Sequence, residues 1–306
     1  MYNFTTSGFF MSITDFIDYL RFEKNYSAHT ITAYRGDLES LEEFLNNDYE
    51  VEIKEATYPL IRSWITTLMD EKVTSRSINR KVSSLKAYYK YLRVIGELEV
   101  NPLEHHKSLK TAHKVQVPFS KTEVEKILNT SYDQMDFISV RNVLIIEILY
   151  VTGMRRAELI DLSINDVNLS ANTLRVTGKR NKQRVIPLIK SIFIKLHAYI
   201  NLRKQVANIE SVELFVTEKG VKLYPSLVYR IINTYFSEVS SKVKRSPHML
   251  RHSFATHLLD EGADLNAVKE ILGHASLAST QVYTHTSMTM LKGVYKNAHP
   301  RSNKRK

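Results

Sequence analysis

The sequence contains no cysteine in its 306 residues. Disulfide bonds, thiolate metal sites and cysteine nucleophiles are therefore excluded, and the absence is typical of proteins in a reducing compartment. Long hydrophobic runs are also missing, because the longest, residues 143–151, is interrupted by Glu147 and is far below the ~18 residues of a membrane span. The N-terminal residues lack the basic and small-residue pattern of a signal peptide. We expect a cytoplasmic protein that does not cross a membrane.

Negative charge is the scarcer sign in this chain. Lys and Arg number 43 against 32 Asp and Glu, which gives a formal net charge of +11. Such a surplus favours a polyanionic partner, nucleic acid first, although a membrane surface would also attract it. The chain is 43% hydrophobic and 25% charged, as folded proteins are, and 306 residues exceed what one compact core usually holds. We therefore expect two domains.

Apolar residues recur at helical spacing through the first hundred residues. The spacing predicts helices from Ile13 through Leu20, from a Ser27 cap through Leu45, over about Tyr58–Met69, and from a Thr74 cap to a stop at Gly96. Residues 12–100 are thus predicted to form an all-helical domain. Residues 1–11 are candidates for a disordered extension ahead of it.

The last of these predicted helices has a basic face beside its apolar stripe. Its cations are Arg76, Arg80, Lys81, Lys86 and Lys90, with tyrosines among them. A charged face is usually only solvated, but the net positive charge makes these five side chains candidate DNA contacts. Residues 101–119 follow with two prolines, several cations and no apolar period, which is typical of a basic linker.

Residues 120–306 are predicted to form a second domain, mostly helical with a small antiparallel β-sheet. Ser120 and Glu123 have the spacing of a capping box. Further helices are predicted over Val140–Val151, Leu188–Val206, Pro225–Ser237, His248–Asp260 and Asp264–Leu272. Alternation over Thr173–Thr177 and Arg184–Leu188 around a turn-rich segment predicts a hairpin. The whole chain is therefore expected to be mainly α.

Polar residues gather at the ends of these helices. His248 and Arg251 share the first turn of a helix, where unpaired backbone N–H groups favour an anion such as phosphate. Arg155 and Glu158 lie three residues apart after a buried helix ends at Gly153, a common spacing for an exposed ion pair. Each pair alone has an ordinary structural explanation, namely local packing or a solvated ion pair.

Four segments nevertheless resemble, in order and spacing, the tyrosine site-specific recombinases, and most closely their XerC/XerD branch. They are TGMRRAEL at 152–159, GKRNKQRVIPL at 178–188, PHMLRHSFATHLL at 247–259 and LGHASLASTQVYTH at 272–285. The likeness extends over about residues 12–300. It implies an N-terminal core-binding, SAM-like domain and a catalytic domain. The catalytic residues it implies are Arg155, Lys179, His248, Arg251, His274 and the nucleophile Tyr283, with Glu158 as an accessory acid.

The resemblance implies a reaction in which Tyr283 attacks a DNA phosphorus and leaves a 3′-phosphotyrosine and a free 5′-hydroxyl. Arg155 and Arg251 would hold the non-bridging oxygens. Lys179 would protonate the leaving oxygen, and the two histidines would donate hydrogen bonds or carry protons. Because one ester replaces another, no metal, ATP or other cofactor is expected.

The implied partner is double-stranded DNA, bound by a homotetramer or by a heterotetramer with a second Xer-like recombinase. A C-terminal tail is expected to dock on the neighbouring subunit, and a DNA translocase is a candidate regulator. Resolution of chromosome dimers is the expected role.

Other functions remain open at this stage. They are an integrase or transposase of a mobile element, a type IB topoisomerase-like enzyme, and a non-catalytic DNA-binding module, which the intact Lys179 and Tyr283 disfavour. A zinc enzyme using His248, His252 and His257 is disfavoured because no acid lies between the first two.

Overall fold

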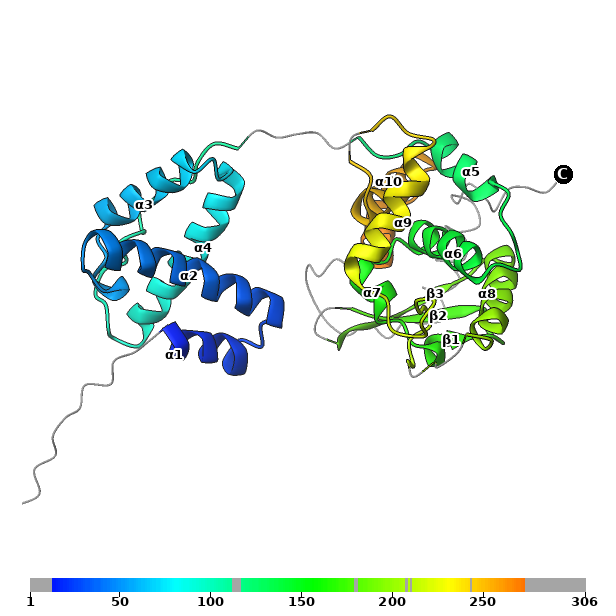
Figure 1. Ribbon diagram of the computed structural model, residues 1–306, viewed down its shortest axis with the longest axis horizontal. Coiled ribbons are helices and arrows are strands. Elements are labelled where there is room, and N and C mark those ends of the chain that lie inside the picture. Colours follow the sequence, from blue (N-terminus) through cyan, green and yellow to red (C-terminus); the bar gives the residue numbers. More distant parts are fainter. Residues whose placement is uncertain are drawn as a thin grey trace, which may run out of the picture. The chain divides into compact units, whose positions relative to one another are not determined.

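The computed structural model describes residues 13–111, 117–178, 181–206, 209, 211–242 and 244–272. The chain divides into two compact units, residues 1–114 and 115–306 (Figure 1). Each has a hydrophobic core of its own. We call them the first and the second unit.

The first unit is built from helices that bury the predicted apolar stripes. Helix α1 spans Ile13–Asp18 and continues as a π-helical turn, Tyr19–Glu23. Helices α2, α3 and α4 span Ala28–Asp48, Tyr58–Asp70 and Ser75–Val94, with a 3₁₀ turn at Ile53–Glu55. The side chains of Ser27 and Thr74 accept hydrogen bonds from backbone N–H groups of the first turns of α2 and α4. Both predicted caps are confirmed, and each offsets one unpaired donor.

One end of the predicted basic linker packs into the core of the first unit, and the other end packs into the core of the second. Leu103 is fully buried in the core of the first unit, and Phe119 is fully buried in the core of the second. Phe119 stacks on Phe236 with ring centroids 3.9 Å apart. Apolar side chains near the linker ends therefore join the cores, although no period in the sequence marks them.

The second unit surrounds one buried helix. Its helices are α5 Lys121–Asn129, α6 Phe137–Thr152, α7 Arg156–Ile160, α8 Lys190–Arg203, α9 Pro225–Ser237, α10 Pro247–Asp260 and α11 Leu265–Leu272. Helix α6 contacts α5, α7, α8, α9 and α10, and 12 of its 16 side chains are buried. Because it is covered all round, its sequence is apolar all round.

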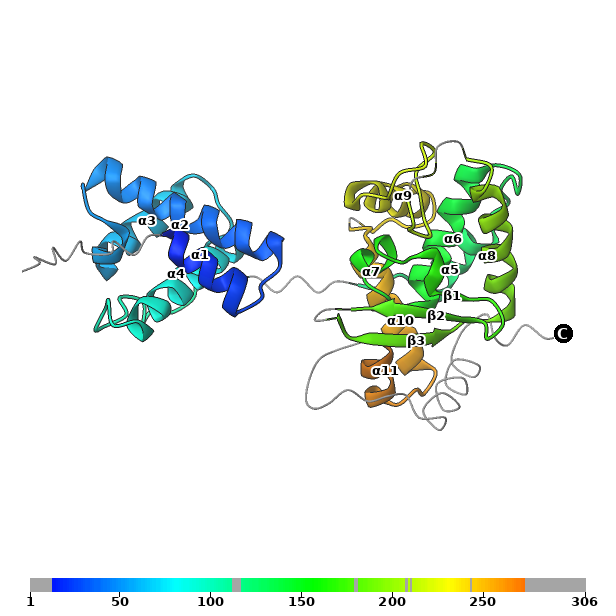
Figure 2. The same ribbon diagram turned by 90° about the horizontal axis from the view of Figure 1, so that it is seen from below.

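The second unit also contains a three-stranded antiparallel sheet, with α6 above its strands and α11 below them in the view of Figure 2. Strands β1, β2 and β3 span Val167–Asn168, Thr173–Thr177 and Gln183–Pro187, in that order across the sheet, and a 3₁₀ turn at Ile164–Asp166 precedes them. In the hairpin Val176 pairs with Arg184 and Leu174 with Ile186. The predicted strand at 173–177 is confirmed, whereas β1 was not predicted because two residues show no alternation.

The starts of two predicted helices differ by two or three residues from those observed. Helix α6 begins at Phe137 rather than Val140, because the side chain of Asp136 caps it by accepting a hydrogen bond from the Ser139 N–H at 2.8 Å. Helix α8 begins at Lys190 rather than Leu188, because the Leu188 N–H donates to the Asn172 carbonyl at 2.8 Å and so continues the sheet.

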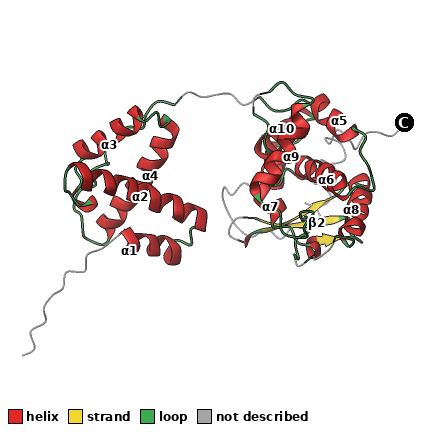
Figure 3. Cartoon of the chain, in the orientation of Figure 1, coloured by secondary structure: helices red, strands yellow, loops and turns green. Residues whose placement is uncertain are grey.

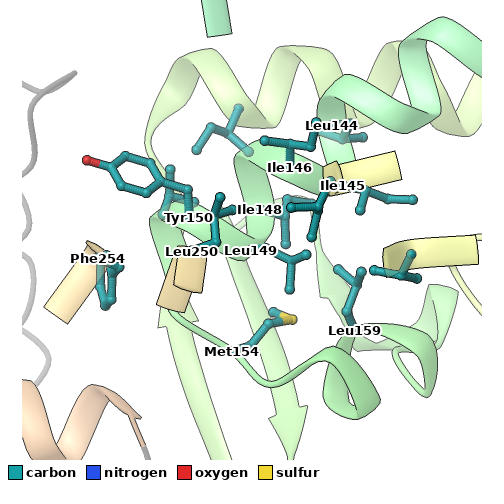
Figure 4. Packing of buried hydrophobic residues seen from close by; sticks show 14 of the residues in the cluster. Leu144, Ile145, Ile146, Ile148, Leu149, Tyr150, Met154, Leu159, Leu250 and Phe254 are labelled. Atoms are coloured by element: carbon teal, nitrogen blue, oxygen red, sulfur yellow. The ribbon is translucent and has the colours of Figure 1, made fainter. Parts of the chain in front are cut away.

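Helices dominate both units, and among the described residues strands occur only in the second (Figure 3). The predicted fold class, mainly α with a small antiparallel sheet, is confirmed. The core of the second unit joins α6 to the segment after it and to α10, through Leu149, Met154, Leu159, Leu250 and Phe254 (Figure 4). Leu250 and Phe254, four residues apart, therefore lie on the core-facing side of α10. This packing fixes the corner at which the candidate site lies.

Candidate active site

The site is built on the corner between α6 and α7. Gly153 ends α6 in the left-handed conformation, with φ of 59°. The next residue, Met154, is buried, and Arg155 is the N-cap residue of α7. The corner therefore places Arg155 one residue after a buried anchor.

Only glycine fits the corner. A Cβ on Gly153 would lie 2.4 Å from Cδ1 of Phe254 and 2.8 Å from Cδ2 of Leu272. Positive φ also disfavours side chains other than glycine. The close approach brings the end of α6 against α10 and α11, and so joins three of the four sequence segments.

Glu158 is the buried centre of the corner. Its Oε1 accepts hydrogen bonds from Nη1 of Arg155 at 2.9 Å and Nη1 of Arg184 at 3.1 Å. Its Oε2 accepts from the Arg155 backbone N–H at 2.8 Å and from Nη2 of Arg184 at 2.7 Å. Burial raises the pKa of this carboxyl, but the two arginines outweigh it and lower the pKa below its ordinary value. Glu158 is thus an anion at neutral pH, held by four donors.

Arg184 was not predicted as a site residue, and the pair of Arg155 and Glu158 is not the simple exposed ion pair that its spacing suggests. Arg184 is buried on β3 and alternates with the exposed Gln183 and half-buried Val185. It shares the core-facing side of the strand with Ile186. An arginine at a core position of an alternating strand is a signal that could have found it, because such a side chain needs a buried acid.

Arg251 lies beside the same corner. Its Nη1 donates to the Gly153 carbonyl at 2.6 Å, and its Nη2 donates to the Leu272 carbonyl at 2.7 Å. The side chain is buried, and burial together with the charge of Arg155 lowers its pKa to about 10. Arg251 therefore remains a cation at neutral pH. The structure brings Arg155, Glu158 and Arg251 together from segments about a hundred residues apart.

His248 occupies the first turn of α10, which Ser246 caps by accepting from the Met249 N–H. Partial burial and the neighbouring Arg251 lower the pKa of His248. The imidazole is consequently neutral at pH 7, with one nitrogen able to donate and the other able to accept. Ser246 satisfies one of the N–H groups that were expected to face an anion.

Lys179, His274 and Tyr283 lie outside the described residues. Gly178, immediately before Lys179, is described: its N–H donates to the Lys182 carbonyl at 2.7 Å, and a Cβ on it would lie 3.2 Å from Oε1 of Glu158. The base of the hairpin at Gly178 thus lies beside the buried acid.

The histidine set considered for zinc does not converge. Nδ1 of His257 lies 2.9 Å from the hydroxyl of Tyr150 in the core. In the part of the chain that the structure describes, no three His, Asp or Glu side chains are placed to hold a metal ion.

The predicted basic face of α4 divides into two groups. Both terminal nitrogens of Arg80 donate hydrogen bonds to the buried carboxylate of Asp37, at 2.5 and 2.7 Å. Nζ of Lys81 lies 3.6 Å from the same carboxylate. Lys86 donates to a backbone carbonyl, that of His106, at 3.0 Å. These three cations therefore help to hold the first unit together.

The other two predicted DNA contacts, Arg76 and Lys90, are exposed on α4. Lys86 and Lys90 line a hollow with Arg93 at the end of this helix.

Comparisons with known proteins now decide the family. The chain matches the phage integrase family over residues 95–290 and the phage integrase N-terminal SAM-like domain over residues 13–94. It is 37% identical over 298 residues to the tyrosine recombinase XerC of Bacillus licheniformis, covering 96% of this chain and 98% of that protein. XerC of Bacillus subtilis is 37% identical over 95% of this chain and 96% of that protein. The chain belongs to the tyrosine recombinase family.

Solved structures share the fold of this recombinase. XerH site-specific recombinase bound to palindromic difH substrate has a TM-score of 0.68 at 23% identity, covering 89% of this chain and 81% of that one. The Tn1549 transposon integrase in complex with transposon right end DNA has a TM-score of 0.67 at 21% identity, covering 95% and 97%.

The recombinase is a DNA-binding enzyme that cuts and rejoins strands through a phosphotyrosine link, as its family does. Its curated relatives match over nearly the whole chain and carry the XerC name, which favours the Xer type over a topoisomerase or a non-catalytic module. Across the described residues, no helix is both long and apolar enough to span a membrane.

Proposed function

We propose that this recombinase resolves chromosome dimers in the cytoplasm, by exchanging strands between paired DNA sites. The observation that carries the proposal is the convergence of two arginines on one corner of an Xer-type chain: Arg251 donates to the Gly153 carbonyl at 2.6 Å, and Arg155 begins α7 two residues later. Burial and then the neighbouring charge of Arg155 lower the pKa of Arg251.

Two arginines side by side suit a phosphodiester. A guanidinium donates two parallel hydrogen bonds to phosphate oxygens, and positive charge placed in advance stabilises the charge that develops as a nucleophile attacks phosphorus. Arg155 and Arg251 are therefore assigned to the non-bridging oxygens. Neutral His248 is assigned a hydrogen bond to the same phosphate.

The remaining roles fall on residues beyond the described ranges. Tyr283 is assigned the attack on phosphorus, which forms the 3′-phosphotyrosine and releases the 5′-hydroxyl. Lys179 is assigned the proton for that leaving oxygen, and His274 a hydrogen bond to the phosphate or a proton-carrying role. Attack by the 5′-hydroxyl of the other duplex then reverses the ester exchange, so no cofactor is consumed.

The working assembly is proposed to be a tetramer on two paired sites, either of this chain alone or with a second Xer-like recombinase. The C-terminal tail is proposed to dock on the neighbouring subunit, and a DNA translocase to regulate the complex. Gel shifts on full sites, with each Xer-like protein of the same cell added in turn, distinguish the two assemblies. Full cooperativity without any addition supports the homotetramer.

The decisive test uses nicked DNA carrying candidate chromosomal sites, which traps the covalent complex. We expect wild-type protein and Tyr295→Phe to form adducts on a denaturing gel. Tyr283→Phe should bind the same DNA and form none, because it lacks only the attacking hydroxyl. Adducts that persist in Tyr283→Phe would refute the assignment of the nucleophile.

The role of Lys179 has its own test. Lys179→Ala should slow cleavage by about 10²–10⁴-fold, the usual contribution of a positioned proton donor. A substrate with sulfur in place of the bridging 5′-oxygen should recover most of the rate, because a thiolate leaves without protonation. Equal slowing on both substrates would mean that Lys179 only binds DNA.

The DNA-facing side of α4 is proposed to present Arg76 and Lys90. Replacing either with Gln should reduce the slope of log affinity against log salt by about 1, because one phosphate contact is lost. Lys54 is the control cation in the same unit, since it pairs with Glu52 at 3.0 Å. An unchanged slope in both α4 variants would exclude this face.

A further inference from the structure

We propose that Arg184 is a positioning residue for strand cleavage, which holds Arg155 in its phosphate-binding orientation through the shared carboxylate of Glu158. The inference rests on the proposed role of Arg155. It assigns a function to an arginine of β3 that the catalytic set does not include.

The contacts show how Arg184 reaches Arg155. Nη1 and Nη2 of Arg184 donate to the two oxygens of Glu158 at 3.1 and 2.7 Å. The same two oxygens accept from Nη1 and from the backbone N–H of Arg155 at 2.9 and 2.8 Å. Each oxygen is therefore shared by the two arginines, and a shift of the carboxylate would disturb both bonds to Arg155.

Burial separates the roles of the two arginines. The side chain of Arg184 is 7% exposed and that of Glu158 is 5% exposed, whereas the side chain of Arg155 is 42% exposed. Arg155 can meet a phosphate from solvent, and Arg184 faces the carboxylate. The buried Arg184 side chain is therefore not placed to contact DNA directly.

An ion pair between neighbouring turns of a short helix would orient Arg155 poorly by itself. Helix α7 has only five residues, and exposed pairs at this spacing contribute little. Arg184 ties the carboxylate to a strand that is hydrogen-bonded along its length to β2. The strand thus supplies the rigidity that the short helix lacks, because a planar guanidinium fixes both carboxylate oxygens at once.

The test compares cleavage of two substrates by Arg184→Met and Arg184→Lys. One substrate has the ordinary scissile phosphate. The other has a methylphosphonate there, in which a methyl group replaces one non-bridging oxygen and removes the negative charge. Arg175 of β2 supplies the matched control, because it also pairs with an acid, Asp166, at 2.9 Å but is 49% exposed and outside the corner.

We expect Arg184→Met to cleave the phosphate substrate about 10²-fold more slowly at saturating DNA, as a misplacement of about 1 Å does. Affinity for a single half-site should change less than threefold, and Arg175→Met should cleave normally. Arg184→Lys should also be slow, because its ammonium keeps the charge without the two-pronged bond. On methylphosphonate, the deficits of both Arg184 variants should shrink to a few-fold, since the charge that Arg155 stabilises is gone.

Arg155→Met is assayed in parallel, so that failure of the inference on Arg184 can be distinguished from failure of the proposed role of Arg155. If the methylphosphonate restores Arg155→Met but leaves the deficit of the Arg184 variants unchanged, the inference is wrong and the proposed function stands. If it does not restore Arg155→Met, the role of Arg155 falls, and the inference with it. If Arg184→Met does not fold, Arg184→Lys and the double variant with Glu158→Gln and Arg184→Gln decide, and normal cleavage by either overturns the inference.

Discussion

Replacement of Gly153 by alanine tests the corner on which the site is built. Two separate costs are expected. The left-handed backbone, with φ of 59°, costs a residue with a Cβ about 1–2 kcal/mol. The new Cβ would also lie 2.4 Å from Phe254 Cδ1, although carbon atoms pack at about 3.5–4.0 Å, and overpacking of this kind costs about 1–3 kcal/mol. The sum is about 2–5 kcal/mol.

Gly262 provides the matched control in the same unit. It also has positive φ, 83°, but a Cβ there meets nothing within 4 Å. Gly262→Ala should therefore lose only the backbone cost, about 1–2 kcal/mol. The two variants differ in packing alone, by about 1–3 kcal/mol.

Urea denaturation of the second unit, followed by circular dichroism, measures the difference. With a slope of about 2–3 kcal/mol/M, the midpoint of Gly153→Ala should lie about 0.3–1.5 M below that of Gly262→Ala. Cleavage should fall only in Gly153→Ala, because making room for the Cβ moves the residue 153 carbonyl that accepts from Arg251. Equal midpoints with equal slopes would show that Phe254 of α10 and Leu272 of α11 leave room for a Cβ at position 153, which contradicts the packing argument.

Three further changes have defined outcomes. Burial raises the pKa of Glu123, but hydrogen bonds from Lys242 and nearby serines lower it to about 2. The ionised carboxylate therefore stabilises the fold fully above the unfolded pKa near 4.5, and this stabilisation is lost as the pH falls towards 2. Glu123→Gln should destabilise the protein at pH 7 and much less near pH 3, as measured by urea titration at each pH. Asp37→Asn should lower the unfolding free energy of the first unit by about 2–4 kcal/mol, because the buried partner of Arg80 is lost; an unchanged midpoint would refute this. Gly36→Ala, on α2 with open space around it, should raise the thermal midpoint through about 0.5–1 kcal/mol of helix propensity, and a lower midpoint would contradict the prediction.

Much of the fold could be predicted because the apolar residues recur with a regular helical period over long segments. The caps at Ser27, Thr74 and Ser120 have the side-chain contacts that their sequence patterns predict. The misses are short elements: β1 has two residues and α7 has five, too few to show a period. Such elements form because tertiary contacts hold them, and those contacts join residues distant in sequence.

The candidate site shows the same division. Its described residues Arg155, Glu158, His248 and Arg251 could be named from the family pattern, which is a pattern of sequence segments. Their partners could not: Arg251 donates to carbonyls at Gly153 and Leu272, 98 and 21 residues away in the chain. Every residue has a backbone carbonyl, so no residue type marks such a partner.

The two arginines of the corner are held by different chemistry, and the difference suits a shared phosphate. Backbone carbonyls at the ends of α6 and α11 orient Arg251; helix C-termini favour a cation but carry only partial charge. Arg155 bonds to a full carboxylate, yet that carboxylate is shared with Arg184. Arg155, Arg184 and Arg251 together with Glu158 therefore sum to a net charge of +2. A surplus of this sign at a partly buried corner is costly until an anion arrives, so the same contacts that orient the cations also favour the binding of phosphate.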